Sequence, residues 1–420
     1  MSFGCPLGAD RGDETISCSY SRFGAITMPF ALYLLALVVF AMGTSEFMLA
    51  GLVPDISTHF SVSVGTAGLL TSAFAAGMMI GAPVMAALTR RLPVKATLLG
   101  CVIVFALTHI IGALTPDFTV LFITRVIAAI VNAGFLAVAL GAATKLVAPD
   151  AKGRAVAVLL AGTTVATVAG VPAGALLGTA LGWQSTFWAI ALLCIPAAIG
   201  IAAGFTTDAG DSSKEESSST SLRVELAQLS SPRLVLTMLL AALVNTGTFA
   251  TLTFLAPIVT DTADLSQWWV PVALVLFGVG SFIGVTVAGR LSDARPRIVI
   301  VGGGNVLVLG WVALALFATN PVALLGLVFT QGVVGFAVGS TLITRVLYAA
   351  ASAPTMAGSY ATAALNVGAA AGPVLAAAAL SVIPGALGPV WVAALATTTA
   401  LLLAVPLIRL IAPVESEVVK

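Results

Sequence analysis

Long apolar stretches alternate with short polar segments along the chain. Each has about the 20 residues that a helix needs to cross the hydrocarbon core of a bilayer. Twelve such stretches fall near residues 30–53, 65–88, 96–114, 118–144, 155–181, 186–205, 234–259, 268–289, 298–317, 321–350, 357–381 and 387–411. The pattern predicts an all-α membrane protein with twelve transmembrane helices.

A longer polar interval divides the twelve stretches into two sets of six. Residues 206–233 are rich in Ser and charged side chains, which is typical of a solvated linker. The expected segments are tail 1–28, bundle 29–205, linker 206–233, bundle 234–411 and tail 412–420. Residues 1–27 lack the apolar run of a signal peptide. Met28 is either the native start or the end of a tail, and the sequence leaves both open.

Composition supports a membrane location and excludes several functions. Of the 420 residues, 59% are hydrophobic and 8% are charged, whereas soluble domains carry about 25% charged residues. The formal net charge of +1 gives no reason to expect a nucleic-acid partner. The four cysteines lack the spacing of a metal site or of a disulfide framework, so we expect no metal.

Lys and Arg are distributed unevenly among the loops. Seventeen of the 18 basic residues fall in the tails or in the loops after the second, fourth, sixth, eighth and tenth predicted helices. Because cytoplasmic loops carry an excess of Lys and Arg, this bias predicts that both termini and the linker are cytoplasmic. The exception is Arg125, inside the fourth predicted helix.

The two halves repeat each other at an offset of 203 residues. Matched pairs are Pro54 with Pro257, Gly77 with Gly280, and Gly81 with Gly284. Beyond the third helix the register slips by two or three residues, so that Arg125 best matches Gln331. Two repeated six-helix bundles are typical of secondary transporters, whose binding site lies between the bundles.

Three short motifs occur in order on the expected helices. They are the loop 289–297 (GRLSDARPR), Arg125 in the fourth helix, and Gly170-x-Pro172-x-Gly174 in the fifth. Together they resemble the drug:proton antiporters of the major facilitator superfamily. Stretches such as GTSEFMLAGLVPDI and GVPAGALLGTALGW extend the resemblance, over residues 28–411, to bacterial chloramphenicol-resistance exporters.

Three positions depart from the pattern of the family. Arg90 stands where the superfamily has Asp, Pro93 stands where it has Gly, and Gln184 replaces an expected Arg. The first bundle therefore lacks the acid that a cytoplasmic clasp of that kind requires.

The resemblance implies a proton-coupled exporter of the bacterial inner membrane that moves chloramphenicol by alternating access. Its partners would be the drug, protons and the lipid bilayer, and we expect a monomer. The chain lacks the G-x-x-x-x-G-K-[ST] motif of nucleotide-driven pumps, so the proton gradient is the expected energy source and no cofactor is expected. The resemblance also implies that Asp293 helps to close a cytoplasmic gate, with Arg295 and Arg91 beside it. The alternatives are a solvated loop acid and basic residues that only fix topology.

The fifth helix carries Gly170, Gly174 and Gly178 at a spacing of four, so one face is nearly bare backbone. Such a face permits close helix approach, and Pro172 can bend the helix. We expect this contact to rearrange during transport, and static packing is the alternative.

Two opposite charges lie well inside the predicted spans. Glu46 is seven residues before Val53, and Arg125 is seven residues after Phe118. Each lies roughly 10 Å below the outer boundary, so we expect a direct or water-bridged pair. A change in water access, or in the distance between them, would make Glu46 bind and release a proton. Asp55 is expected at the outer mouth, either collecting protons or as a solvated acid.

Uncharged polar and aromatic residues within the spans suggest a site for a neutral, aromatic, amide-bearing drug. The candidate contacts are Asn132, Asn245, Gln331, Asn366, Phe47, Tyr33 and Phe135. For the polar residues the alternative is a hydrogen bond between helices, and for the aromatic residues it is contact with lipid.

Other functions fit the sequence less well than drug export does. An intramembrane enzyme would need a catalytic motif, and the two histidines form neither H-E-x-x-H nor any comparable pattern. A channel or receptor fits less well with the six-plus-six repeat and the buried acid. Export of a sugar, a nucleoside or several drugs remains the nearest alternative.

Overall fold

The computed structural model describes residues 29–89, 92–148, 151–204, 227–353 and 356–411. Within these ranges every regular element is a helix, and twelve helical segments are long and apolar enough to cross a membrane. The predicted all-α class and number of spans are therefore confirmed.

The first half contains six spans. Its elements are α1 (Phe30–Phe47), α2 (Leu49–Phe60), α3 (Val64–Thr89), α4 (Val94–Leu114), α5 (Phe118–Lys145), α6 (Lys152–Val165), η2 (Ala166–Gly170), α7 (Val171–Leu181) and α8 (Trp183–Gly204). The first span is longer than the predicted 30–53, because α2 continues it to Phe60 after a break at Met48. The fifth span consists of α6, η2 and α7 together.

The second half contains the other six spans. Its elements are η4 (Ala227–Ser230), α10 (Pro232–Thr253), α11 (Leu255–Pro257), η5 (Ile258–Thr262), α12 (Trp269–Leu291), η6 (Ile298–Gly302), α13 (Gly303–Phe317), α14 (Pro321–Ala349), α15 (Ala357–Val382) and α16 (Gly388–Ile411). Most of the predicted linker and both tails lie outside the described residues, so their boundaries stay predictions.

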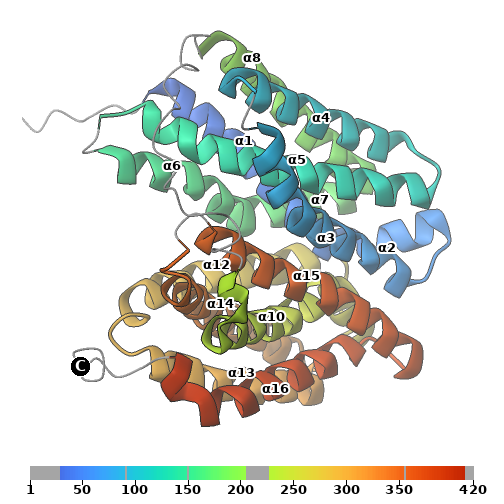
Figure 1. The fold of residues 1–420 in the computed structure, drawn as a ribbon. Coiled ribbons are helices and arrows are strands. Elements are labelled where there is room, and N and C mark those ends of the chain that lie inside the picture. Colours follow the sequence, from blue (N-terminus) through green and yellow to red (C-terminus); the bar gives the residue numbers. More distant parts are fainter. Residues whose placement is uncertain (1–28, 90–91, 149–150, 205–226, 354–355, 412–420) are drawn as a thin grey trace, which may run out of the picture.

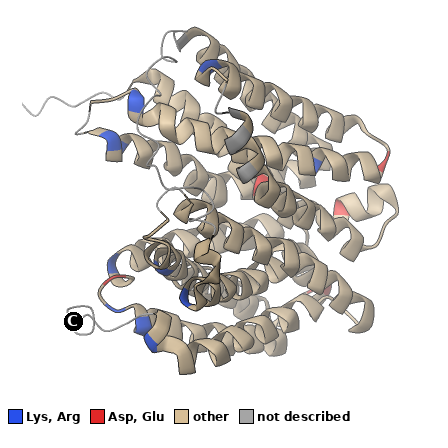
Figure 2. Ribbon diagram, viewed as in Figure 1, with Lys and Arg blue, Asp and Glu red and all other residues tan. Residues whose placement is uncertain are grey.

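The two halves form two helical bodies, with α1 to α8 in one and α10 to α16 in the other (Figure 1). Each half is built mainly around one large hydrophobic cluster, and each cluster also takes in a few residues of the other half. Blue Lys and Arg positions gather mostly at the end of the molecule that also holds the C-terminus (Figure 2). This clustering is the one that the distribution of Lys and Arg along the sequence predicts for a cytoplasmic end.

Contacts between the halves run through α3 with α15 and through η2 and α7 with α12. At the outer tip of α3, a Cβ built on Gly65 would lie 3.2 Å from the Cβ of Ala377. Further in, the Ser72 hydroxyl donates to the carbonyl oxygen of Ala370 at 2.7 Å. The halves thus meet from the Gly65 end of α3 inward, and their ribbons diverge toward the end that holds the C-terminus (Figure 1).

Candidate functional site

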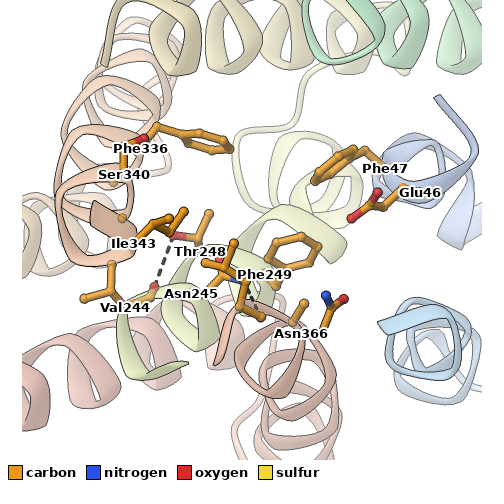
Figure 3. A pocket seen from close by; sticks show the side chains of 14 residues that line it. Glu46, Phe47, Val244, Asn245, Thr248, Phe249, Phe336, Ser340, Ile343 and Asn366 are labelled. Atoms are coloured by element: carbon orange, nitrogen blue, oxygen red, sulfur yellow. Dashed lines mark hydrogen bonds between the residues drawn. The ribbon is translucent and has the colours of Figure 1, made fainter. Parts of the chain in front are cut away.

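A cavity lies between the two halves, and the space in it that the centres of water-sized molecules can occupy is about 150 Å³. The first half contributes only two lining residues, and three helices of the second half contribute the rest (Figure 3). The lining residues are Glu46 and Phe47 of α1, Val244, Asn245, Thr248 and Phe249 of α10, Gly335, Phe336, Gly339, Ser340 and Ile343 of α14, and Leu365, Asn366 and Ala369 of α15.

The two amide side chains of the cavity are anchored through their nitrogen atoms. Asn245 Nδ2 donates to the carbonyl oxygen of Leu365 at 2.7 Å, and Asn366 Nδ2 donates to that of Thr362 at 2.9 Å. The Thr248 hydroxyl donates to the carbonyl oxygen of Val244 at 3.2 Å. This bonding leaves the two amide oxygens as acceptors for a ligand.

Aromatic rings form part of the wall. The ring centroids of Phe47 and Phe249 lie 5.6 Å apart, one from each half. Phe336 on α14 lies on another side of the same cavity (Figure 3). Phe249 occupies the repeat position of Glu46, so the two matched positions of the repeat line one cavity. The arrangement offers flat apolar surfaces to a planar group.

Glu46 is the charged residue of this cavity lining, and its carboxylate faces the cavity (Figure 3). Ser45, one position earlier on α1, is fully buried in the first half. The guanidinium of Arg125 donates to Ser45, from Nη1 to the hydroxyl at 2.7 Å and from Nη2 to the carbonyl oxygen at 2.6 Å. The predicted common depth of the two charges is thereby borne out.

The predicted direct pair is absent in this conformation. Among the described residues, no nitrogen of Arg125 lies within 4.0 Å of a carboxylate oxygen of Glu46. The reason is geometric: successive residues on a helix point about 100° apart, so Arg125 reaches the buried side of α1 while Glu46 faces the cavity. A water-bridged contact stays a prediction.

Sequence reasoning missed the partner of Ser45. His109 of α4 lies with Nε2 2.8 Å from the Ser45 hydroxyl and Nδ1 2.7 Å from the carbonyl oxygen of Phe105. The available signal was His109 itself, a histidine inside an apolar span and five residues before the end of that span.

Of the seven candidate drug contacts, three line the cavity and four do not. Asn245, Asn366 and Phe47 are the three that do. Asn132 and Phe135 are buried within the first half on α5. Their positions could not be predicted because the rotation of α5 is set by its packing against neighbouring helices.

The other two candidates also lie away from the cavity. Gln331 is 1% exposed and donates from Nε2 to the carbonyl oxygen of Leu307 at 3.1 Å, which is the hydrogen bond between helices named as its alternative. Tyr33 of α1 is 51% exposed and is not part of the cavity lining.

The acidic candidates at the two ends of the molecule have different surroundings. Asp55 is half-buried on α2 and is not part of the cavity lining. Asp293 accepts from Arg345 Nη2 at 3.3 Å and from the Tyr348 hydroxyl at 3.0 Å. Both partners belong to α14 of the same half, so Asp293 makes no bridge to a described residue of the other half in this conformation. Arg295 is exposed, and Arg91 lies outside the described residues.

The glycines of the fifth span pack closely against the first and sixth spans, as the bare face predicts. A Cβ on Gly170 would collide with the Thr44 hydroxyl, and a Cβ on Gly174 would lie 2.9 Å from Thr186 of α8. The chain forms a π-helical turn, η2, just before Pro172. Proline lacks the N–H of a regular helix, and π-turns often mark functional places in helices.

Comparison with known proteins places this architecture among transporters. The sequence matches the model of the Major Facilitator Superfamily over residues 35–373. A chloramphenicol resistance protein of Streptomyces lividans is 62% identical over 379 residues, which cover 90% of this chain and 96% of the relative. The inner membrane transport protein YdhP of Escherichia coli (strain K12) is 31% identical over 360 residues, covering 86% and 90%.

Solved structures show the same fold at low sequence identity. A bacterial homologue of the human lysosomal transporter Spinster, in its inward-facing and unoccupied conformation, has a TM-score of 0.67 at 17% identity, covering 91% of this chain and 95% of that one. The nucleoside transporter NupG has a TM-score of 0.71 at 13% identity, covering 90% and 98%. The resemblance indicated by the motifs is confirmed.

Proposed function

Because the chain belongs to the major facilitator superfamily, we propose that it exports chloramphenicol across the cell membrane of a bacterium in exchange for protons. One observation carries the proposal: a single carboxylate, Glu46, faces a cavity between the two halves whose other described lining is neutral. An ionisable group inside a membrane protein commonly marks the path of a transported ion. The similarity to the Streptomyces lividans resistance protein supports the choice of drug.

The chemistry of the cavity suits this drug. Chloramphenicol is a neutral aromatic amide with two hydroxyl groups, so it brings several hydrogen-bond donors and one planar ring. The oxygens of Asn245 and Asn366 accept hydrogen bonds, and Phe47, Phe249 and Phe336 flank a planar ring. Few polar groups in an otherwise apolar cavity orient such a ligand without a large desolvation cost.

Drug is exchanged for protons because drug binding and protonation of the Glu46 carboxylate compete with each other. In the inward-facing arrangement the cavity is reached from the cytoplasm, where drug binds and Glu46 releases its proton. After the halves rock over, the cavity faces outward, drug leaves and Glu46 takes up a proton from outside. The gradient then drives export, with no nucleotide or other cofactor.

The setting of the protein is part of the proposal. The basic residues at one end of the described bundle support cytoplasmic termini in the inner membrane. A complete cavity formed by a single chain supports a monomer as the working unit.

Growth of a sensitive bacterial host tests the substrate. The host should lack its own exporters and express the chain, and growth is compared on chloramphenicol, on unrelated drugs and with toxic nucleoside or sugar analogues. Resistance to chloramphenicol that needs an energised membrane is the expected result. Protection only against the analogues would replace the proposal by export of another neutral solute, and protection against many drugs would make the chain a multidrug exporter.

A further inference from the structure

Three side chains buried behind Glu46 form a hydrogen-bonded chain across three helices of the first half. Arg125 of α5 donates to Ser45 of α1 at 2.7 Å, and the Ser45 hydroxyl lies 2.8 Å from Nε2 of His109 on α4. The chain ends where Nδ1 of His109 meets the carbonyl oxygen of Phe105 at 2.7 Å. Arg125, Ser45 and His109 are each at most 1% exposed.

The direction of each hydrogen bond follows from its partners. A carbonyl oxygen only accepts, so Nδ1 of His109 carries a hydrogen and donates to Phe105. In the neutral ring, Nε2 is then an acceptor. The Ser45 hydroxyl accepts from Arg125 and donates its own hydrogen to Nε2. The α4 backbone therefore orients the His109 ring, the ring orients the Ser45 hydroxyl, and the hydroxyl orients the guanidinium of Arg125.

Arg125 has no carboxylate partner among the described residues, so Ser45 is its polar anchor. Its guanidinium also lies over the ring of Phe74, 4.5 Å from the centroid. Nε has no hydrogen-bond partner within the described part of the chain. A buried cation held by so few groups depends strongly on each of them.

We propose that His109 is a positioning residue for proton coupling: through the Ser45 hydroxyl it holds Arg125 at a fixed place behind Glu46. The inference rests on the proposed role of Glu46. Because α1, α4 and α5 belong to the same half, the network moves together with Glu46 when the halves rock. The positive charge then stays at a constant distance from the carboxylate, and access to the cavity is what changes between the two states.

Two substitutions at one position separate positioning from packing. In His109→Gln, the side-chain oxygen reaches about as far as Nε2 and can still accept from Ser45. In His109→Asn, the shorter side chain can still donate to Phe105 but leaves the Ser45 hydroxyl without its acceptor. His59→Gln, at an exposed histidine on α2, is the control for the chemical change itself.

The purified full chain is reconstituted in liposomes and assayed in two ways with chloramphenicol. Uptake driven by an imposed pH gradient reports coupling, and exchange of labelled for unlabelled drug at equal pH reports binding and rocking. We expect His109→Asn to lose roughly threefold to tenfold in driven uptake, the size of one hydrogen bond between neutral groups, with exchange unchanged. His109→Gln and His59→Gln should retain both activities.

Ser45→Ala provides an independent second variant. It should reproduce the loss in His109→Asn, and the double variant should be no worse than either single one because both remove the same link. Driven uptake at the wild-type level in His109→Asn and Ser45→Ala would overturn the inference. A parallel fall of exchange and driven uptake, or a fall that His109→Gln shares, would also overturn it in favour of packing.

Glu46→Gln separates failure of this inference from failure of the proposed function. If Glu46→Gln keeps wild-type driven uptake, the coupling role of Glu46 is wrong and the inference falls with it. If Glu46→Gln loses driven uptake while His109→Asn does not, only the positioning role is wrong.

Discussion

Arg125 donates hydrogen bonds to both the hydroxyl and the carbonyl oxygen of Ser45, the residue directly before Glu46. The cation of α5 therefore contacts the turn of α1 that carries the acid, without an ion pair between the two side chains. The Glu46 carboxylate remains free to face the cavity, where the proposed mechanism requires drug and protons to reach it. A direct ion pair would instead have occupied the carboxylate and hindered its exchange with water.

Glu46→Gln should abolish drug accumulation that is driven by a proton gradient. The amide is nearly the same size as the carboxylate but cannot take up and release a proton, so binding should persist while coupling is lost. The measurement is chloramphenicol uptake into energised inverted vesicles, beside drug exchange without a gradient.

The matched control for this prediction is Asp117→Asn. Asp117 caps α5 by accepting from the backbone N–H of Thr119 at 2.7 Å, and Asn caps helices equally well. This variant should behave as wild type, so loss in both variants would show that removing any outer acid suffices. Uptake against a gradient by Glu46→Gln at the wild-type rate would contradict the role of Glu46.

The sequence alone predicted what depends on length and composition. Twelve spans follow from apolar length, whereas the cytoplasmic location that Lys and Arg predict for one end stays a prediction. The common depth of Glu46 and Arg125 followed from counting residues along two helices.

What the sequence could not supply is the rotation of each helix about its axis. Asn245 and Asn366 face the cavity, whereas Asn132 and Gln331 are turned into their own halves, although all four are amides within spans. Packing among several helices sets that rotation, and no local pattern records it. The hydrogen bond between His109 and Ser45 could not be predicted either, because the two residues are 64 positions apart and lie on helices whose relative rotation is set by packing.

A disulfide between Gly65→Cys and Ala377→Cys should lock the outer end and stop transport. The built Cβ of Gly65 lies 3.2 Å from that of Ala377, near the separation of about 3.5–4.5 Å that a disulfide requires. Because the two residues belong to different halves, the bond prevents the outer end from opening. Oxidised protein should lose export, and a reducing agent should restore it.

The experiment needs a background that lacks the four native cysteines. Each single cysteine variant serves as its own control and should transport under oxidising conditions. Full transport by the cross-linked double variant would show that the outer contact of α3 with α15 does not open during the cycle.

Gly170→Ala should destabilise the protein by about 1–3 kcal/mol, the usual cost of overpacking a close contact. The backbone of Gly170 is regular, with φ −65° and ψ −47°, so Ala fits the helix and the effect comes from its collision with Thr44. The measurement is the midpoint of thermal aggregation in detergent. Gly153→Ala on α6, where the new Cβ meets no atom within 4 Å, is the control and should not lower the midpoint. Equal midpoints for the two variants would contradict tight packing of the fifth span on the first.

Asn366→Leu should weaken chloramphenicol binding by about tenfold, because the drug loses an acceptor for one of its donors while the cavity keeps its shape. The matched control is Gln331→Met, in which the Met side chain has nearly the length of Gln. It removes a buried amide that donates a hydrogen bond to the carbonyl oxygen of Leu307 inside the second half. That variant should lower the thermal midpoint and leave the dissociation constant unchanged. Equilibrium binding of labelled drug to purified protein measures the first quantity, and thermal aggregation measures the second. A larger dissociation constant in Gln331→Met, together with an unchanged dissociation constant in Asn366→Leu, would contradict the prediction. It would place the drug on the other side of α14, away from the cavity that Glu46 faces.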